Sequence, residues 1–509
     1  MLPSRGSTQT KTVEATFSQR TGMIYIFNII VGTGALALPK GFHEGGYVLS
    51  SLLLIILGVF SYITATYIIE AMAIANFMRR KTATRCLNTI ASTTSDEEEN
   101  VDESDQASLL PRAINDDDID IYVSTETQIR HDFDIVEKVE MGEMAEMFLN
   151  KLGLVIFYVC ISLYLFGDLA IYGSAVPKSI RDVICTYEPA NCTNITMHHL
   201  CWANSSLTRH NVYQIFVAVF FCTLGIFVFG NAQKTKLLQL VTTLCRWSAF
   251  LSMIILCIIH LAKRASGEHQ DPVRPPIFNF GSLPRLFGIC VYSFMCHHSI
   301  PSIIAPIRSK DKLKSLFAYD YICIALFYLL LSLTAVFTFN TFEDLYTLNF
   351  RPTTRCIHSN VDVPRPLAYF ISLFPVFTLS SSFPIIGITL RNNLETILKS
   401  CVNIQRKQRF ILVIFVLLLP CTISILVENI NFLVGFTGSY AGVAVQYVIP
   451  ALLVYNARRQ AQVKFRRPIQ FVNQSFFQNK FWVFGVLLWA WLAIIVITIY
   501  YIIPSSVST

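Results

Sequence analysis

The feature that most constrains this chain is a series of long, nearly uncharged apolar segments, each of about 20 residues. Of the 509 residues, 53% are hydrophobic, which is more than a soluble protein of this size normally carries. A helix of about 20 residues crosses roughly 30 Å of hydrocarbon. About eleven spans are predicted, near residues 21–41, 47–72, 153–176, 212–230, 237–261, 284–306, 316–340, 365–390, 410–427, 431–456 and 481–503. We therefore expect an all-α, multi-pass membrane protein.

The loops between the spans predict an orientation. Lys and Arg gather in alternate loops, for example at 79–81 and 458–459, and basic loops stay in the cytosol. The N-terminus is then cytosolic and the C-terminus is lumenal or extracellular. The loop 177–211 falls outside and holds three glycosylation sequons, at Asn191, Asn194 and Asn204. The outer loops also hold four cysteines whose pairing the sequence leaves open, Cys185, Cys192, Cys201 and Cys356.

Residues 77–138 differ in composition from the rest of the chain. They read DEEE at 96–99 and DDD at 116–118, with few apolar side chains, so we expect a disordered cytosolic insertion. Within it, Asp105, Leu109 and Leu110 match the acidic dileucine pattern that clathrin adaptors bind. This pattern favours an endosomal or lysosomal membrane, with the plasma membrane as the alternative. A plain solvated linker is the simpler interpretation of the segment.

These features divide the chain into consecutive parts. The predicted parts are a cytosolic tail (1–20), spans 1 and 2 (21–76), the acidic insertion (77–138), an amphipathic segment (139–152), spans 3 to 5 with the lumenal loop (153–261), spans 6 to 10 (284–456) and span 11 (481–503). The amphipathic segment has methionines at helical spacing and is expected to lie at the inner membrane surface.

Two spans carry helix-breaking residues in mid-membrane. Span 1 contains Gly32-Thr33-Gly34, and span 6 contains His297-His298 followed by Pro301. Backbone groups freed there must face protein, water or a ligand, although glycines also serve close helix packing. Spans 1 and 6 lie five helices apart and run in opposite senses, as expected of inverted repeats with the substrate between broken helices. The predicted substrate-binding residues are Asn28, Gly32, Thr33, Gly34, Tyr292, Ser293, Phe294 and His297.

Charged and hydroxyl side chains within the spans suggest a coupling site. Asp168 in span 3 is costly in lipid unless it is paired, protonated or hydrated, and Arg246 in span 5 is a partner of opposite sign. A structural ion pair and a role in proton coupling are both open. In span 8, Thr378, Ser381 and Ser382 are candidate ligands for an ion, although such hydroxyls often bond their own helix. Sodium and protons remain alternatives as the coupling ion.

Several motifs resemble one transporter superfamily, the amino acid/auxin permeases. They are Asn28–Gly34 with Leu36, Leu38 and Pro39, then Tyr292–His297, and Gly435–Gly442 with Tyr447–Pro450. Gly167–Tyr172, the acidic insertion and Leu390–Asn393 further resemble the animal transmembrane protein 104 family within it. This resemblance covers nearly the whole chain. It implies a leucine-transporter-like fold of 5+5 inverted repeats plus one C-terminal helix, and transport of amino acids. It does not extend to an acid at Asp168.

Other function classes find little support in the sequence. The positive charge is spread over the loops without a basic stripe, so no nucleic-acid partner is predicted. Nucleophile–base spacing, phosphate loops and metal clusters are not found, so neither an enzyme nor a cofactor is predicted. The expected partners are a small amino-acid-like solute and the lipid bilayer. The alternative to a transporter is an amino-acid receptor that signals without transport.

Overall fold

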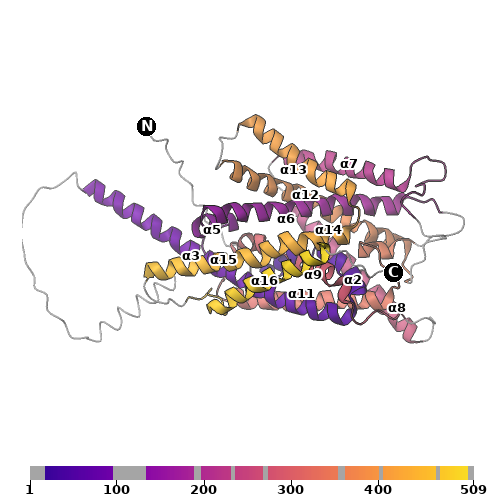
Figure 1. Ribbon diagram of the computed structural model, residues 1–509, viewed down its shortest axis with the longest axis horizontal. Helices are drawn as coiled ribbons and strands as arrows, with labels where there is room; N and C mark the ends of the chain where they lie inside the picture. Colours follow the sequence, from indigo (N-terminus) through magenta and orange to yellow (C-terminus); the bar gives the residue numbers. More distant parts are fainter. Residues whose placement is uncertain are drawn as a thin grey trace, which may run out of the picture.

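The computed structural model describes residues 18–95, 133–188, 196–230, 236–266, 273–352, 361–399, 405–465 and 471–502. In these ranges the chain is built from helices that lie side by side along the long axis of the molecule (Figure 1). The same ranges hold no strand beyond one isolated bridge, between Leu200 and Thr208. The predicted all-α class is therefore confirmed.

Ten helical stretches in the described ranges are long and apolar enough to cross a membrane, and a bent pair provides an eleventh. The bent pair is span 1, which consists of α1 (Gln19–Ile30) and α2 (Thr33–Gly45) at 56° to each other. The other unbroken spans are α3 (Tyr47–Ser95), α6 (Lys151–Ile184), α7 (Arg209–Val228), α8 (Lys236–Ala265), α11 (Leu313–Thr338), α12 (Arg365–Lys399), α13 (Arg406–Leu426) and α16 (Lys480–Ile502). The span count and positions agree with the sequence prediction.

Spans 6 and 10 depart from regular α-helix. Span 6 comprises η1 (Phe280–Ser282), α9 (Leu283–Ser293), η2 (His297–Ser299) and α10 (Ile300–Ile304), with a break at residues 294–296. Span 10 begins as α14 (Ile430–Thr437), widens into π-helix at η4 (Gly438–Gly442) and η5 (Ala444–Val448), and continues as α15 (Ile449–Phe465). A short 3-10 turn, η3 (Tyr346–Phe350), lies between α11 and α12. Such irregular turns leave backbone groups unpaired in the helix and often mark functional sites.

Glycines bring α2, α9 and α14 into backbone contact. A Cβ atom on Gly34 would lie 2.6 Å from the Cα of Ser293, and one on Gly288 would lie 1.9 Å from the carbonyl oxygen of Gly435. A Cβ on Gly438 would lie 2.0 Å from the carbonyl oxygen of Gly288. Small residues permit this approach between membrane helices. The two broken spans, 1 and 6, are thereby packed against each other and against span 10.

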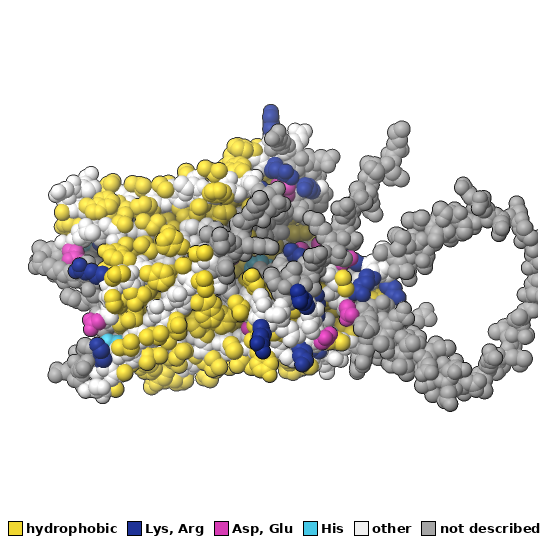
Figure 2. Space-filling view, turned by 180° about the vertical axis from the view of Figure 1, so that it is seen from behind, with side chains coloured by type: hydrophobic (Ala, Val, Ile, Leu, Met, Phe, Trp, Pro, Cys, Tyr) yellow, Lys and Arg dark blue, Asp and Glu magenta, His cyan; other side chains and the backbone are white. Residues whose placement is uncertain are grey.

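The outer surface of the helices is apolar. Figure 2 shows a broad band of hydrophobic side chains, with the coloured Lys, Arg, Asp and Glu side chains gathered toward its two ends. Exposed side chains such as Leu163, Ile226 and Trp491 belong to this surface. Lipid is the solvent in which such a band is stable. The chain is an integral, multi-pass membrane protein.

The boundaries predicted for the acidic insertion, 77–138, were too wide. Helix α3 continues through residue 95, and residues 133–138 pack against its side. Phe133 stacks between Phe77 and Phe471, at ring-centroid distances of 4.5 Å to each. The side chain of Asn76 accepts hydrogen bonds from the backbone of residues 136 and 137. Aromatic stacking and this amide cap order both ends of the insertion, whereas Asp105, Leu109 and Leu110 lie outside the described residues.

The predicted amphipathic segment forms a short helix, α5 (Met141–Phe148). Its Met141, Met144 and Phe148 are buried, and the helix contacts α3, α6 and α15. Glu140 and Glu143 form a capping box at its start. The apolar face of this helix is therefore covered by protein.

Candidate functional site

The break in span 1 leaves three carbonyl groups without helical partners, and other helices supply the donors. Nη1 of Arg246, on α8, donates to the carbonyl oxygens of Asn28 at 2.5 Å and Val31 at 3.0 Å. The hydroxyl of Tyr328, on α11, donates to the carbonyl oxygen of Ile30 at 3.1 Å. Unpaired carbonyls are costly in a membrane. The break is thus a stable feature of the fold.

The break in span 6 is held by the same tyrosine. The Tyr328 hydroxyl also lies 2.8 Å from the carbonyl oxygen of Ser293, the last residue of α9. One side chain therefore bridges the backbone of the two broken spans. Phe294, in the break, packs its ring against Tyr328 and Tyr321.

A carboxylate lies beside these breaks. Asp168 of α6 is buried, and its Oδ1 accepts a hydrogen bond of 2.6 Å from the hydroxyl of Tyr292. The Tyr292 oxygen lies 3.1 Å from the Oγ1 of Thr33. Because the tyrosine proton goes to Asp168, the threonine hydroxyl donates to the tyrosine oxygen. Spans 1, 3 and 6 thus meet in one hydrogen-bonded chain.

Of the eight predicted substrate-binding residues, only part of the set lies together. Thr33 and Tyr292 share the chain to Asp168, and Gly34 packs against Ser293. The Ser293 hydroxyl donates to the Ile289 carbonyl within its own helix. Gly32 has open space where a Cβ would stand, with no atom within 4 Å. The junction of α2 with α9 is therefore the part of the predicted site that the structure assembles.

His297 points away from that junction. Its Nε2 lies 3.2 Å from the carbonyl oxygen of Ser61 and 2.9 Å from the Oγ1 of Thr64, both on α3. The Nε2 therefore carries the proton and donates it to the carbonyl. This geometry matches the alternative use of a membrane histidine, which is to satisfy interior backbone.

The predicted ion pair between Asp168 and Arg246 does not form in the described structure. Asp168 is hydrogen-bonded by Tyr292, and the printed hydrogen bonds of Arg246 go to oxygens of span 1. The prediction failed because it counted opposite charges and could not see the carbonyls freed by the helix break. A guanidinium finds a sufficient partner in carbonyl dipoles at a helix C-terminus.

The hydroxyl groups predicted to bind an ion bond their own helix. Thr378 donates to the Phe374 carbonyl at 3.1 Å, and Ser381 and Ser382 both donate to the Thr378 carbonyl, at 2.8 and 3.1 Å. This is the ordinary behaviour of Ser and Thr in membrane helices. Within the parts of the chain that the structure describes, no group of three His, Cys, Asp or Glu side chains could hold a metal ion.

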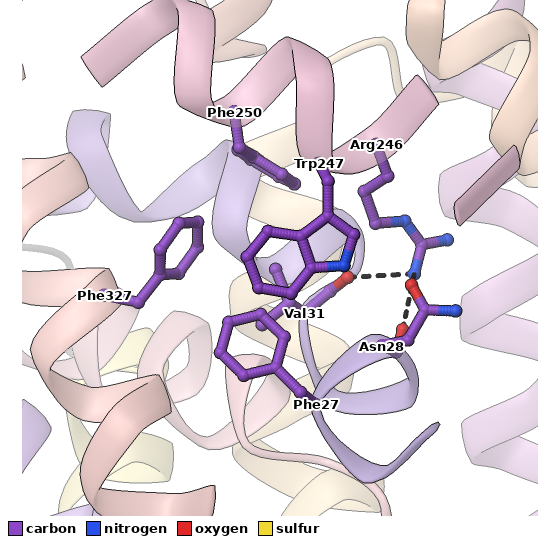
Figure 3. Close-up of a pocket in the computed structure, with 7 residues that line it drawn as sticks. All are labelled: Phe27, Asn28, Val31, Arg246, Trp247, Phe250 and Phe327. Atoms are coloured by element: carbon purple, nitrogen blue, oxygen red, sulfur yellow. Dashed lines mark hydrogen bonds between the residues drawn. The ribbon is translucent and has the colours of Figure 1, made fainter. Parts of the chain in front are cut away.

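A small pocket lies on the α1 side of the break (Figure 3). It is lined by Phe27, Asn28, Val31, Arg246, Trp247, Phe250 and Phe327. The ring of Trp247 stacks on Phe27 at 4.4 Å, and the Arg246 guanidinium points toward Asn28 and Val31. The pocket combines aromatic walls with one permanent positive charge.

A buried ion cluster ties span 1 to span 3 near the loop that follows α11. Asp344 accepts hydrogen bonds from Lys40 of α2 at 2.5 Å and from Lys178 of α6 at 2.6 Å. Burial by itself raises the pKa of the Asp344 carboxyl, but attraction to Lys178 and Lys40 outweighs burial and lowers that pKa below its usual value. A lowered pKa means that the pairs stabilise the fold above the unfolded value of about 3.9 and weaken as the pH falls through the folded value. They therefore remain charged near pH 5.

The loop that follows α6 contains a disulfide bond. Cys185 and Cys201 are joined, with their Cα atoms 4.5 Å apart. Asn204 is exposed on the same loop. The other candidates, Cys192, Cys356, Asn191 and Asn194, lie outside the described residues.

Four contributors to this region were missed from the sequence. They are Thr243, Asp320, Tyr328 and Asp344. Asp320 on α11 is buried, and its Oδ2 has no hydrogen-bond partner among the described residues. As a carboxylate inside a predicted span, it could have been found by the rule that singled out Asp168. Tyr328 gave no comparable signal, since it stands in an apolar run.

Comparisons with known proteins agree with this fold. A family model described as transmembrane amino acid transporter protein matches residues 15–85 and 136–498. Transmembrane protein 104 of Homo sapiens is 40% identical over 497 residues, covering 95% of this chain and 96% of that protein. The transmembrane protein 104 homolog of Drosophila melanogaster is 39% identical over 502 residues, covering 95% and 97%. The homolog of Dictyostelium discoideum is 35% identical over 516 residues, covering 95% and 97%.

These matches confirm the resemblance that the sequence motifs indicated. The family model skips residues 86–135, which correspond to the acidic insertion and its edges. It covers the remaining spans, including both broken ones. The chain therefore belongs to the transmembrane amino acid transporter protein family and, within it, to the group of proteins named transmembrane protein 104.

Proposed function

We propose that the protein is a secondary active transporter that carries amino acids across its membrane by alternating access. The observation that carries this proposal is the bridge made by Tyr328, whose hydroxyl binds the backbone of both broken spans at 3.1 and 2.8 Å. Family membership supports it, because the family model describes amino acid transporters. Broken helices that meet near the membrane midplane are where such proteins bind substrate.

The substrate would bind at the junction of α2 with α9. The N-terminus of α2, at Gly32 and Thr33, presents free backbone N–H groups and the positive end of a helix dipole, which suit a carboxylate. Tyr292 and Asp168 lie beside it and suit the amino group or a proton. Asp168 is the group we assign to proton coupling, because an acid in a membrane helix is costly unless it has a function.

Uptake into liposomes tests this function. We expect the purified chain to take up at least one amino acid from a labelled panel, saturably, under an imposed proton gradient. Gly34→Ala should lose most of this uptake, because its Cβ would stand 2.6 Å from the Ser293 backbone. Gly230→Ala is the matched control, since its Cβ would meet only one atom, at 3.5 Å.

The same experiment separates transport from sensing. Saturable binding of an amino acid by detergent-purified protein, with no flux for any member of the panel, would replace the transporter by the receptor. Neither binding nor flux for any amino acid would refute the assignment of amino acids as ligands.

The location proposed is an endosomal or lysosomal membrane with the N-terminus in the cytosol. Basic loops, the sequon-bearing loop 177–211 and the Cys185–Cys201 disulfide support this orientation, because glycans and stable disulfides belong to the lumenal side. The dileucine pattern at Leu109 and Leu110 supports adaptor-dependent sorting. We expect Leu109→Ala/Leu110→Ala to move the protein from lysosomes toward the cell surface in imaging. Unchanged lysosomal co-localisation would remove the sorting claim, and a wild-type chain insensitive to glycosidase would remove the orientation.

A further inference from the structure

The broken end of α1 is an arrangement suited to a cation. Where a helix is interrupted in a membrane, its last carbonyl oxygens carry the negative end of the helix dipole. Transporters of this architecture use such carbonyls to coordinate sodium. In this chain the oxygens concerned are the carbonyls of Asn28 and Val31, together with the side-chain Oδ1 of Asn28.

A side chain already occupies that position. Nη1 of Arg246 lies 2.5 Å from the Asn28 carbonyl oxygen, 3.0 Å from the Val31 carbonyl oxygen and 3.3 Å from Asn28 Oδ1. One guanidinium nitrogen thus approaches all three oxygens, as Figure 3 illustrates. The guanidinium is charged at every physiological pH, so it cannot release its proton during a cycle. It acts as a fixed cation and not as a proton carrier.

Neighbouring contacts hold the guanidinium in place. Nδ2 of Asn28 donates to Oγ1 of Thr243 at 2.7 Å, which turns the amide oxygen of Asn28 toward Arg246. Thr243 and Arg246 are three residues apart on α8 and therefore share one face of the helix. The next residue, Trp247, stacks on Phe27. Three successive contacts thus fasten α8 to the end of α1.

The remaining oxygens at this depth are also engaged. The Ile30 carbonyl accepts from Tyr328, and the hydroxyls of Thr378, Ser381 and Ser382 donate to carbonyls of their own helix. Sodium requires several oxygen ligands at once, and the oxygens that would supply them already have donors. Removal of Arg246 would free the three oxygens that it binds.

We propose that Arg246 is a resident cation that takes the place of a coupling sodium ion, so that the protein works independently of sodium. The uptake part of this inference rests on the proposed transport function, whereas its ion-binding part does not. It leaves the proton as the coupling ion and Asp168 as its carrier.

Thermal unfolding of the purified full-length chain tests the ion-binding part. Melting is compared in NaCl and KCl at equal ionic strength for the wild type, Arg246→Met and Arg246→Lys. We expect the wild type and Arg246→Lys to melt alike in the two salts, because each keeps a cation at the site. Arg246→Met should gain a saturable, sodium-specific stabilisation of a few degrees, because ligand binding to the folded state raises its stability. Arg264→Met is the matched control on α8, where Arg264 Nη1 donates to the Phe337 carbonyl at 2.9 Å, and it should show no sodium response.

Each outcome decides the inference. A sodium-specific shift of the wild type overturns it, and so does a folded Arg246→Met variant that ignores sodium. If Arg246→Met does not fold, the wild type and Arg246→Lys still decide, because a sodium response in either refutes a resident cation and its absence in both supports one. In liposomes the wild type should take up its amino acid equally in sodium and potassium buffers. No uptake by the wild type together with a sodium response in Arg246→Met would refute the transport function and support the resident cation.

Discussion

Gly288→Ala is expected to remove most of the folded protein. The added Cβ would stand 1.9 Å from the carbonyl oxygen of Gly435 and 2.4 Å from the Oγ of Ser439. Overpacking of a well-packed interior typically costs about 1–3 kcal/mol. The cost should lie at the upper end here, because the nearest atom belongs to the backbone and cannot rotate away. We expect a several-fold lower yield of monodisperse protein and a lower melting temperature, measured by fluorescence-detected size exclusion during a thermal ramp.

Gly485→Ala is the control for this variant. Gly485 lies in α16, and a Cβ there would meet no atom within 4 Å, so its yield and melting temperature should equal those of the wild type. A Gly288→Ala protein that matched Gly485→Ala in both measurements would show that α9 and α14 do not touch through their backbones. That result would also remove the basis for placing spans 1, 6 and 10 around one junction.

The arrangement of the spans could be predicted from the sequence because it depends on length and hydrophobicity. Apolar runs of membrane-crossing length lead directly to helices in lipid, and this is why the predicted spans coincide with the observed ones. The break in span 1 was also predictable, since glycines flanking Thr33 weaken a helix at one place. The extent of the acidic insertion was not, because Phe133 is ordered by stacking on Phe77 and Phe471, which are far from it in sequence.

The partners of the site residues could not be predicted in the same way. Asp168 and Arg246 were identified correctly as costly charges within the membrane, yet the groups that stabilise them are a tyrosine hydroxyl and two backbone carbonyls. Backbone carbonyls are present at every residue and give no signal in a sequence. Tyr328 illustrates the same limit, because only the geometry of two helix breaks makes one hydroxyl serve both. Charge counting therefore locates such a site but does not establish its contacts.

Asp168→Asn is expected to abolish proton-driven accumulation while leaving exchange of substrate in place. The amide is nearly the same size as the carboxylate, and its Oδ1 can still accept the Tyr292 hydrogen bond, which is 2.6 Å long in the wild type. What the variant loses is a proton-binding group. A pH difference of one unit supplies about 1.4 kcal/mol per proton, which supports about tenfold accumulation. With the membrane potential clamped, the wild type should approach that ratio, whereas Asp168→Asn should reach only equal concentrations inside and outside.

A second buried carboxyl supplies the control for Asp168→Asn. Asp320 on α11 is buried as well, but it is not part of the hydrogen-bonded chain from Asp168 through Tyr292 to Thr33. We expect Asp320→Asn to keep proton-driven accumulation, and both variants to keep counterflow exchange when corrected for protein amount. Loss of accumulation in Asp320→Asn together with a normal Asp168→Asn would assign the proton to α11. Because Arg246 cannot release a proton, loss in neither variant would exclude both buried acids as the proton carrier and with them the link between the two broken spans and the gradient.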